Sequence, residues 1–259
     1  MRLNWRSLLP AIIIVFCTSC FDKAPIYAVV PTIDFSSLCF KDNSSGNDDD
    51  TLLLVLKFRD GDGDLGLSAA NTSDNDTPFN EKFYFQKQID GSLTKVAINT
   101  TTNLLTYKDK RTNPLYATYP SFVTPYNCTN WEVLYNTDKN PKPIDTVYCE
   151  YNPAHYNITI DFLTKNNDGS FTRYDWTKFF PYPNCVVAGY NGRFPVLSND
   201  LTKKSPLEGL LKYNMQSAYF NLTFSIKTLK LQVQIYDRAL NKSNLLETPE
   251  FTLQSIKCN

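Results

Sequence analysis

The stretch Asp60–Asp64 (DGDGD) has residue types and a spacing that suit the binding of a metal ion. Asp60, Asp62 and Asp64 alternate with glycines, and glycine permits a turn tight enough to aim alternate side chains at one centre. Carboxylate oxygens are ligands that Ca²⁺ prefers, and the ion takes about six to eight oxygens. The EF-hand pattern is absent, because Leu65 stands where that loop needs its glycine. Oxygens from a second segment are therefore required.

The loop Asp237–Asn244 (DRALNKSN) is the candidate for that second segment. When Asp237 is aligned with Asp60, Asn241 falls on Asp64, so both apolar runs end in oxygen-bearing residues with the same offset. The calcium ligands offered by the sequence are Asp60, Asp62, Asp64, Asp237 and Asn241. The alternative is that the Asp-Gly repeat forms a tight turn without an ion. The acids at 48–50 are expected to stay away, because a strand of about eight residues at roughly 3.3 Å each separates them from Asp60.

Short runs of alternating apolar residues predict that β-strands position these loops. The runs cover residues 32–40, 51–58, 82–88, 131–135, 146–151, 156–165, 171–176, 209–213, 219–224, 229–236 and 250–256. Asn166–Ser170 (NNDGS), between two of these runs, predicts a hairpin turn. Residues 200–213 leave room for one helical turn. We predict an all-β, immunoglobulin-like β-sandwich in two modules, the first at residues 32–125 with the DGDGD loop and the second at residues 126–259.

The start of the chain predicts export and attachment to a membrane. Met1–Arg6 is basic, and Ser7–Phe16 is apolar but shorter than the about 20 residues that span a bilayer, as in a secretory signal peptide. Cys20 follows two small residues and resembles the bacterial lipobox cysteine, which receives a diacylglycerol. We predict a signal peptide at residues 1–19, lipidation at Cys20 and a tether at residues 20–31. An ordinary cleaved signal, with Cys20 in a disulfide, is the alternative.

Five cysteines follow Cys20, at positions 39, 128, 149, 185 and 258. Disulfides form in an oxidising exported compartment, and an odd number of cysteines leaves one thiol over. We predict that Cys128 pairs with Cys149 or with Cys185. Because the chain has one histidine, a mixed Cys/His zinc site is not expected.

The charge balance excludes some classes of function. The chain has 26 basic and 26 acidic side chains, so its formal net charge is zero, whereas binding to a nucleic-acid backbone needs a basic excess. Residues 34–90 hold twelve acids and five bases, net −7, which directs attention to the first third of the chain. P-loop, nucleophile-elbow, zinc-protease and dinucleotide motifs are absent. His155, in a loop with proline, is expected to form hydrogen bonds rather than to act in catalysis.

Several motifs together resemble an uncharacterised family of Bacteroidota envelope lipoproteins. They are the lipobox, Pro31–Phe35 (PTIDF), Phe58–Leu67 (FRDGDGDLGL), Tyr156–Phe162 (YNITIDF), Gly192–Leu197 (GRFPVL), Asp237–Asn244 (DRALNKSN) and Glu247–Phe251 (ETPEF). The resemblance implies an outer-membrane lipoprotein with an immunoglobulin-like β fold, on the periplasmic or the surface face, and implies no activity. The Asp-Thr-aliphatic triplets around Thr51 and Thr146 resemble O-glycosylation sites of the same bacterial group.

The sequence thus favours a lipid-anchored, non-catalytic binding or structural protein of the bacterial cell envelope. Its expected partners are the membrane, through the lipid, and a protein or a glycan of unknown identity. Calcium is the one cofactor that the residues suggest. Two other classes stay open, namely a carbohydrate-binding subunit of a surface glycan-uptake system and a glycan-active hydrolase.

Overall fold

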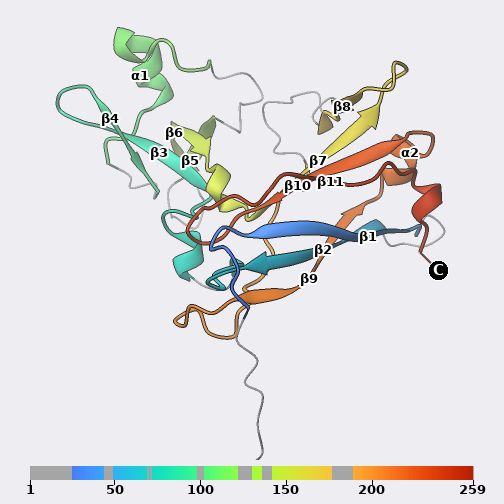
Figure 1. The fold of residues 1–259 in the computed structure, drawn as a ribbon. Coiled ribbons are helices and arrows are strands. Elements are labelled where there is room, and N and C mark those ends of the chain that lie inside the picture. The colour runs from blue at the N-terminus through green and yellow to red at the C-terminus, as the bar shows by residue number, and fades with distance from the viewer. Residues whose placement is uncertain are drawn as a thin grey trace, which may run out of the picture.

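The computed structural model describes residues 25–43, 49–68, 70, 72–97, 102–121, 130–135, 142–176 and 189–258. Their strands form three antiparallel sheets, two of which face each other across a shared core (Figure 1). The prediction of an all-β sandwich is confirmed. The immunoglobulin-like topology stays a prediction.

The two sheets of the sandwich draw their strands from both ends of the chain. The first sheet has the order β1-β2-β9, and the second has the order β11-β10-β7-β8. The strands of the first are β1 Thr32–Lys41, β2 Asp50–Asp60 and β9 Leu207–Ser217. Those of the second are β7 Ile158–Lys165, β8 Phe171–Arg173, β10 Leu229–Ile235 and β11 Leu246–Glu247.

The inward-facing series of β2 and β10 explain why these sheets share one core. Every second side chain of β2 from Leu52 to Phe58 is buried, and so is every second side chain of β10 from Leu229 to Ile235. Successive side chains of a strand point to opposite faces, so each series forms one inward apolar face. Full burial of one such aliphatic side chain stabilises the fold by about 1.5–3 kcal/mol. The sandwich core therefore holds β2 and β10 in a fixed relation.

The third sheet, with the order β4-β3-β6-β5, is inserted in the chain between β2 and β7. Its strands are β3 Lys82–Lys87, β4 Leu93–Val96, β5 Trp131–Tyr135 and β6 Pro143–Tyr151. It has a separate aromatic core that includes Trp131 and Tyr148. Strand pairs run across residue 125, because β2 pairs with β9 and β3 pairs with β6. The fold thus groups the residues as a sandwich and an insertion, unlike the two consecutive modules that we predicted.

Two of the predicted strands are wrong. Residues 219–224 form the helix α2 (Phe220–Phe224), because Phe220 and Phe224 lie four residues apart and both enter the core from one helical face. Leu222, between them, is exposed. In residues 250–256 only Phe251 pairs with β10, through Leu229, and the 3-10 turn η6 (Gln254–Ile256) follows. Residues 200–206 contain no helix, whereas β7 and β8 form the predicted hairpin.

The remaining described helices are short. They are α1 Tyr107–Thr112 and the 3-10 turns η1 Thr72–Asn75, η2 Pro114–Tyr116 and η3 Pro153–His155. A capping box at Thr106 and Asp109 begins α1. Within the described ranges no helix combines the length and the apolar character needed to cross a membrane.

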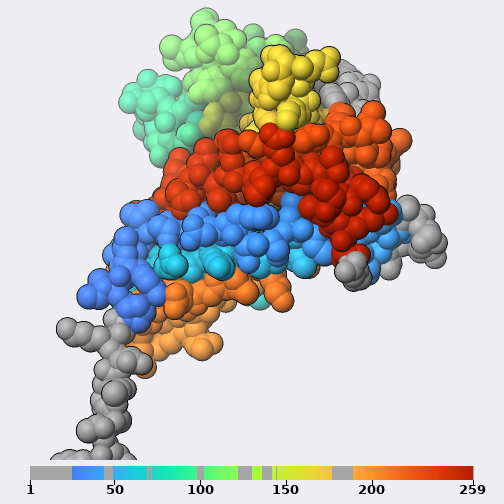
Figure 2. All heavy atoms as spheres, turned by 45° about the vertical axis from the view of Figure 1, so that its right-hand side comes forward, coloured from blue at the N-terminus to red at the C-terminus, as the bar shows by residue number. Residues whose placement is uncertain are grey.

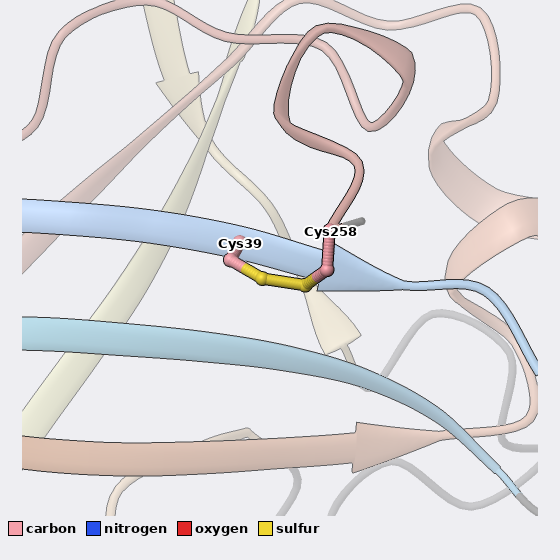
Figure 3. Close-up of a disulfide and its surroundings, with 2 residues drawn as sticks. All are labelled: Cys39 and Cys258. Atoms are coloured by element: carbon pink, nitrogen blue, oxygen red, sulfur yellow. A yellow bond between two sulfur atoms is a disulfide. The ribbon is translucent and has the colours of Figure 1, made fainter.

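A disulfide joins Cys39 of β1 to Cys258 at the end of the chain (Figure 3). The two Cα atoms are 5.3 Å apart, and the Cys258 amide donates to the Phe40 carbonyl at 2.9 Å. The bond ties the last described turn to the edge of the first sheet. The predicted pairing of Cys149 is wrong, because Cys149 is a free thiol buried in the third sheet. Cys128 and Cys185 lie outside the described residues.

Candidate metal centre

Asp60 and Asp237 occupy the same end of the sandwich because each continues an inward face. Asp60 follows Phe58 by two residues on β2, and Asp237 follows Ile235 by two residues after β10. Their side chains therefore point inward like the apolar residues before them, and both are almost fully buried. An isolated bridge between Leu65 and Asp237 joins the two segments at this point.

The DGDGD turn needs its glycines to reach this geometry. Gly63 has a φ of 71°, in the left-handed region that favours glycine. A Cβ atom on Gly61 would lie 2.6 Å from the carbonyl oxygens of Tyr27 and Ala28, so the tether passes directly against the turn. The glycines thus let the chain return and bring Asp64 back beside Asp60, whose Oδ2 accepts the Asp64 amide at 3.1 Å.

Three carboxylates converge at this end of the sandwich. Asp60, Asp64 and Asp237 each offer an oxygen within 4.8 Å of the other two. The Oδ1 atoms of Asp60 and Asp64 are buried and have no hydrogen-bond partner, and the same holds for Oδ1 of Asp62. An unpartnered buried acceptor costs about 1–3 kcal/mol, and more when the group is charged. The described protein groups therefore leave these carboxylate oxygens without a hydrogen-bond donor or a cation.

Asn241 contacts the cluster, and Lys204 contacts Asp62, which lies outside the converging set. Asn241 donates from its backbone amide to Asp237 Oδ1 at 2.7 Å and from its side-chain nitrogen to Oδ2 at 2.8 Å. Asn241 thereby orients Asp237. We predicted Asn241 as a metal ligand, but here it holds a ligand candidate in place instead. The exposed Lys204 lies 3.2 Å from Asp62 Oδ2. Among the described residues no lysine or arginine forms a salt bridge with Asp60, Asp64 or Asp237.

The surroundings raise the pKa of all three converging carboxyl groups. Burial raises the pKa of Asp60 to about 6, and the charge of Asp64 adds to the effect. Burial likewise raises the pKa of Asp64 to about 6, with contributions from Asp237 and Asp62. Burial also raises the pKa of Asp237, against the hydrogen bonds from Asn241. Proton binding or cation binding would each relieve this repulsion.

The donor set selects the type of cation. It contains carboxylate oxygens and no nitrogen or sulfur, which suits a hard ion such as Ca²⁺ rather than zinc or copper. Calcium–oxygen distances of about 2.3–2.6 Å place two ligands on opposite sides of the ion about 5 Å apart. The three carboxylate oxygens all lie within 4.8 Å of one another, so one calcium ion could contact all of them. Three carboxylates leave coordination positions for water or further protein oxygens.

The other predicted site residues lie elsewhere. Asp50, at the opposite end of β2, accepts from the Asn43 amide, and the Asp49 carbonyl accepts from the Asn43 side chain, so these two acids stay away from the cluster as expected. Asp48 lies outside the described residues. Thr51 of β2 and Thr146 of β6 are half-buried strand residues, and their glycosylation stays a prediction. Cys20 lies outside the described residues.

One buried ion pair beside the cluster was not anticipated from the sequence. Arg238 Nη2 lies 2.5 Å from Asp74 Oδ1, and Arg238 Nη1 donates to Asp74 Oδ2 at 3.0 Å. Nη1 also donates to the Gly66 carbonyl at 3.1 Å. Arg238 directly follows Asp237, so the carboxylate of Asp237 lies in the cluster while the guanidinium of Arg238 lies outside it, against Asp74. The only sequence signal was the adjacency of the two charges in DRALNKSN.

His155 takes part in hydrogen bonds between the segment before the third sheet and the segment after β7. Its Nδ1 lies 2.7 Å from Arg193 Nη2, and Arg193 also donates to the carbonyls of His155 and Phe79. This agrees with the hydrogen-bonding role expected for the residue.

Comparison of the chain with protein-family models, with curated proteins and with solved structures gives no match. Function is therefore inferred from the site, since a fold alone does not determine function.

Proposed function

We propose that the protein is a lipid-anchored, non-catalytic binding or structural module of the bacterial cell envelope, stabilised by calcium at one end of its sandwich. The supporting observation is the convergence of Asp60, Asp64 and Asp237 with buried carboxylate oxygens that have no partner. At neutral pH, groups with pKa values near 6 are mostly ionised, so the cluster carries several negative charges. A divalent cation offsets these charges, and the carboxylate oxygens that have no hydrogen-bond partner coordinate it.

The role assigned to calcium is structural. The ion would join the turn after β2 to the loop after β10, and these strands belong to opposite sheets. A ligand that binds the folded state and not the unfolded state raises stability by mass action. The loops at this end would then be fixed in position for recognition of a partner.

Thermal unfolding in calcium and in chelator tests the metal site. We expect a higher melting temperature in calcium for the unaltered protein, and no such shift for Asp60→Asn or Asp64→Asn, because both side chains belong to the converging set. Asp50→Asn is the matched control, because Asp50 is a buried aspartate at the other end of the same strand. It should keep the calcium response. Equal melting temperatures of the unaltered protein in calcium and in chelator would refute the metal site.

The anchor is tested separately by metabolic labelling with palmitate. Label on the unaltered protein that disappears in Cys20→Ser supports lipidation, because the thioether needs that thiol. Label that persists in Cys20→Ser would refute it.

A cavity favours a second function, saccharide binding. Its volume is about 320 Å³, and its lining includes Asp161, Arg173, Asp175 and Trp176. An aromatic ring beside carboxylates suits the apolar face and the hydroxyls of a sugar. Binding on a glycan array that Arg173→Ala and Asp175→Asn weaken, without product release, would support this function. Release of a product would instead indicate a hydrolase.

A further inference from the structure

Strand β9 has a hydrogen-bonding partner on one side only. All eleven of its residues pair with β2 in a continuous register without a bulge. Among the described residues, no main-chain hydrogen bond reaches β9 from the side away from β2. Figure 1 shows β9 at the rim of its sheet, and in Figure 2 the orange part of the chain, which includes β9, lies along the lower edge of the molecule. Such an edge is a template for pairing with another strand.

The hydrogen bonds of the neighbouring strands show which groups of β9 point to the open side. Ile33 and Phe40 of β1 bond outward, to Asn244 and to the Cys258 amide, so the residues between them bond to odd-numbered residues of β2. Even-numbered residues of β2 then bond to odd-numbered residues of β9. The main-chain groups of Glu208, Leu210 and Lys212 are left on the open edge.

The side chains of these three residues are self-complementary. In an antiparallel pair of two β9 strands centred on Leu210, Glu208 stands opposite Lys212 of the second copy, and Lys212 stands opposite Glu208. Leu210, 57% exposed, meets its own counterpart. Opposite charges and apolar pairs directly across two strands each stabilise a sheet by about 0.2–1 kcal/mol. Among the described residues Lys212 forms no salt bridge within the chain, so its charge is available.

The register is bounded on both sides. Pro206 has no amide hydrogen and ends the ladder before Leu207. At the other end the Tyr190 hydroxyl donates to the Gln216 carbonyl at 3.4 Å and caps that part of the edge. A pairing centred on Leu210 uses residues 207–213, between these limits. A centre at Lys212 or at Glu208 would place like charges opposite each other, which destabilises the pairing.

We infer that β9 is a homodimer interface, in which two copies pair their β9 strands antiparallel about a two-fold axis at Leu210. The two three-stranded sheets then form one continuous sheet. Glu208, Leu210 and Lys212 of each copy exchange main-chain hydrogen bonds, about six in all. The same patch is used on both copies, as in the commonest closed oligomers. Glu208 stays on the outer face of its sheet, where Arg59 lies 3.9 Å away.

Site-specific oxidation of the full chain in its native membranes tests the pairing. Leu210→Cys places two thiols across the axis at a Cα separation of about 5.5 Å, within the range of a disulfide. We expect a covalent dimer above the level of the parent chain. Asn214→Cys is the matched control, because it lies on the same edge and face but eight residues from its counterpart in this register. It should give no dimer above that level.

A charge swap distinguishes self-pairing from addition of a strand from another protein. In the Leu210→Cys background, Glu208→Lys alone or Lys212→Glu alone should reduce the covalent dimer about tenfold, and the double exchange should restore it. Melting temperatures identify any variant that is unfolded. The covalent dimer of the double exchange is compared with that of each single variant. No dimer with Leu210→Cys, equal dimer with Asn214→Cys, or failure of the double exchange to restore the dimer would each overturn the inference.

Discussion

Asp60 and Asp74 are both fully buried carboxylates in one small region, but the charged groups next to them have opposite signs. Asp74 receives the guanidinium of Arg238 through two hydrogen bonds. Burial opposes its ionisation, but the bonds from Arg238 and from the Ser68 amide outweigh burial and lower its pKa. Asp60 faces Asp64 instead, and its pKa rises to about 6. Asp74 thus has a cationic partner, whereas no described lysine or arginine forms a salt bridge with Asp60.

The contrast shows how one loop can serve two electrostatic functions. Asp237 and Arg238 are consecutive, yet one contributes to the carboxylate cluster and the other neutralises Asp74. Because the arginine is engaged by Asp74 and Gly66, no lysine or arginine in the described part of the chain neutralises Asp60, Asp64 or Asp237. We infer that the pair fixes the loop whether or not calcium is present, while the cluster responds to calcium.

Removal of Arg238 should have the largest effect on stability. Arg238→Met leaves the buried Asp74 without its cation, and breaking one side of a buried ion pair typically costs about 3–5 kcal/mol. Urea unfolding in chelator measures this loss. Arg59→Met is the control, because its ion pairs are exposed and long, at 3.8 and 3.9 Å, and should cost less than about 1 kcal/mol. Equal losses would contradict the assignment of Asp74 and Arg238 as a self-contained pair.

The effect of Asp60→Asn on the free energy of unfolding should depend on whether calcium is bound. In chelator the variant should be at least as stable as the unaltered protein, because one of the mutually repelling carboxylates is gone. In calcium it should be less stable, by about 2.7 kcal/mol when free calcium is a hundred times the dissociation constant. Urea unfolding in both conditions gives the comparison. A variant that is equally destabilised in both conditions would indicate ordinary loss of packing.

The pH dependence should have opposite signs in the two places. Asp60 and Asp64 have folded-state pKa values of about 6, above the unfolded value of roughly 3.9. In chelator their contribution to stability is present below pH 4 and is lost as the pH rises through 6. The lowered pKa of Asp74 contributes stability above the unfolded value, which is lost as the pH falls.

Unfolding free energies between pH 4 and pH 8 test the contribution of Asp60 and Asp64. In chelator, the stability of Asp60→Asn relative to the unaltered protein should increase as the pH rises through 6. Saturating calcium should remove that trend, since the bound ion favours the ionised carboxylates. A relative stability that is independent of pH in chelator would contradict the raised pKa values.

Lys204→Gln should have the smallest effect. The side chain is 83% exposed and contacts Asp62 at 3.2 Å, and exposed ion pairs contribute about 0–1 kcal/mol. Its removal makes the site more negative, so calcium affinity should rise by at most about fivefold while stability in chelator hardly changes. Calcium titration of both proteins measures the difference. A weaker affinity in Lys204→Gln would show that the lysine organises the site.

Sequence periodicity was sufficient to locate most strands and to bring the two loops together. The inward positions of β2 and β10 continue with period two into Asp60 and Asp237, and this regularity made their alignment meaningful. The same rule failed for residues 219–224, because two phenylalanines four residues apart are compatible with one face of a helix as well as with a strand. Apolar spacing alone does not separate the two in so short a run.

Contacts between distant segments were beyond the reach of the sequence. The disulfide joins residues 219 positions apart, and neither spacing nor composition favoured Cys39 with Cys258 over other pairs. The partner of Arg238 is Asp74, in a 3-10 turn without a distinctive motif. The insertion of the third sheet between β2 and β7 was likewise missed, because strand order in space does not follow strand order in the chain.

Calorimetric titration of the decalcified protein with calcium at pH 6, in buffers of different ionisation enthalpy, tests the metal site most directly. Groups with pKa values of about 6 are half protonated at this pH, and ligand carboxylates must lose their protons to bind the ion. We expect one calcium per chain with release of about one proton at pH 6 and almost none at pH 8. Absence of binding, or binding that Asp60→Asn leaves unchanged, would contradict the assignment of this end of the sandwich as a calcium site.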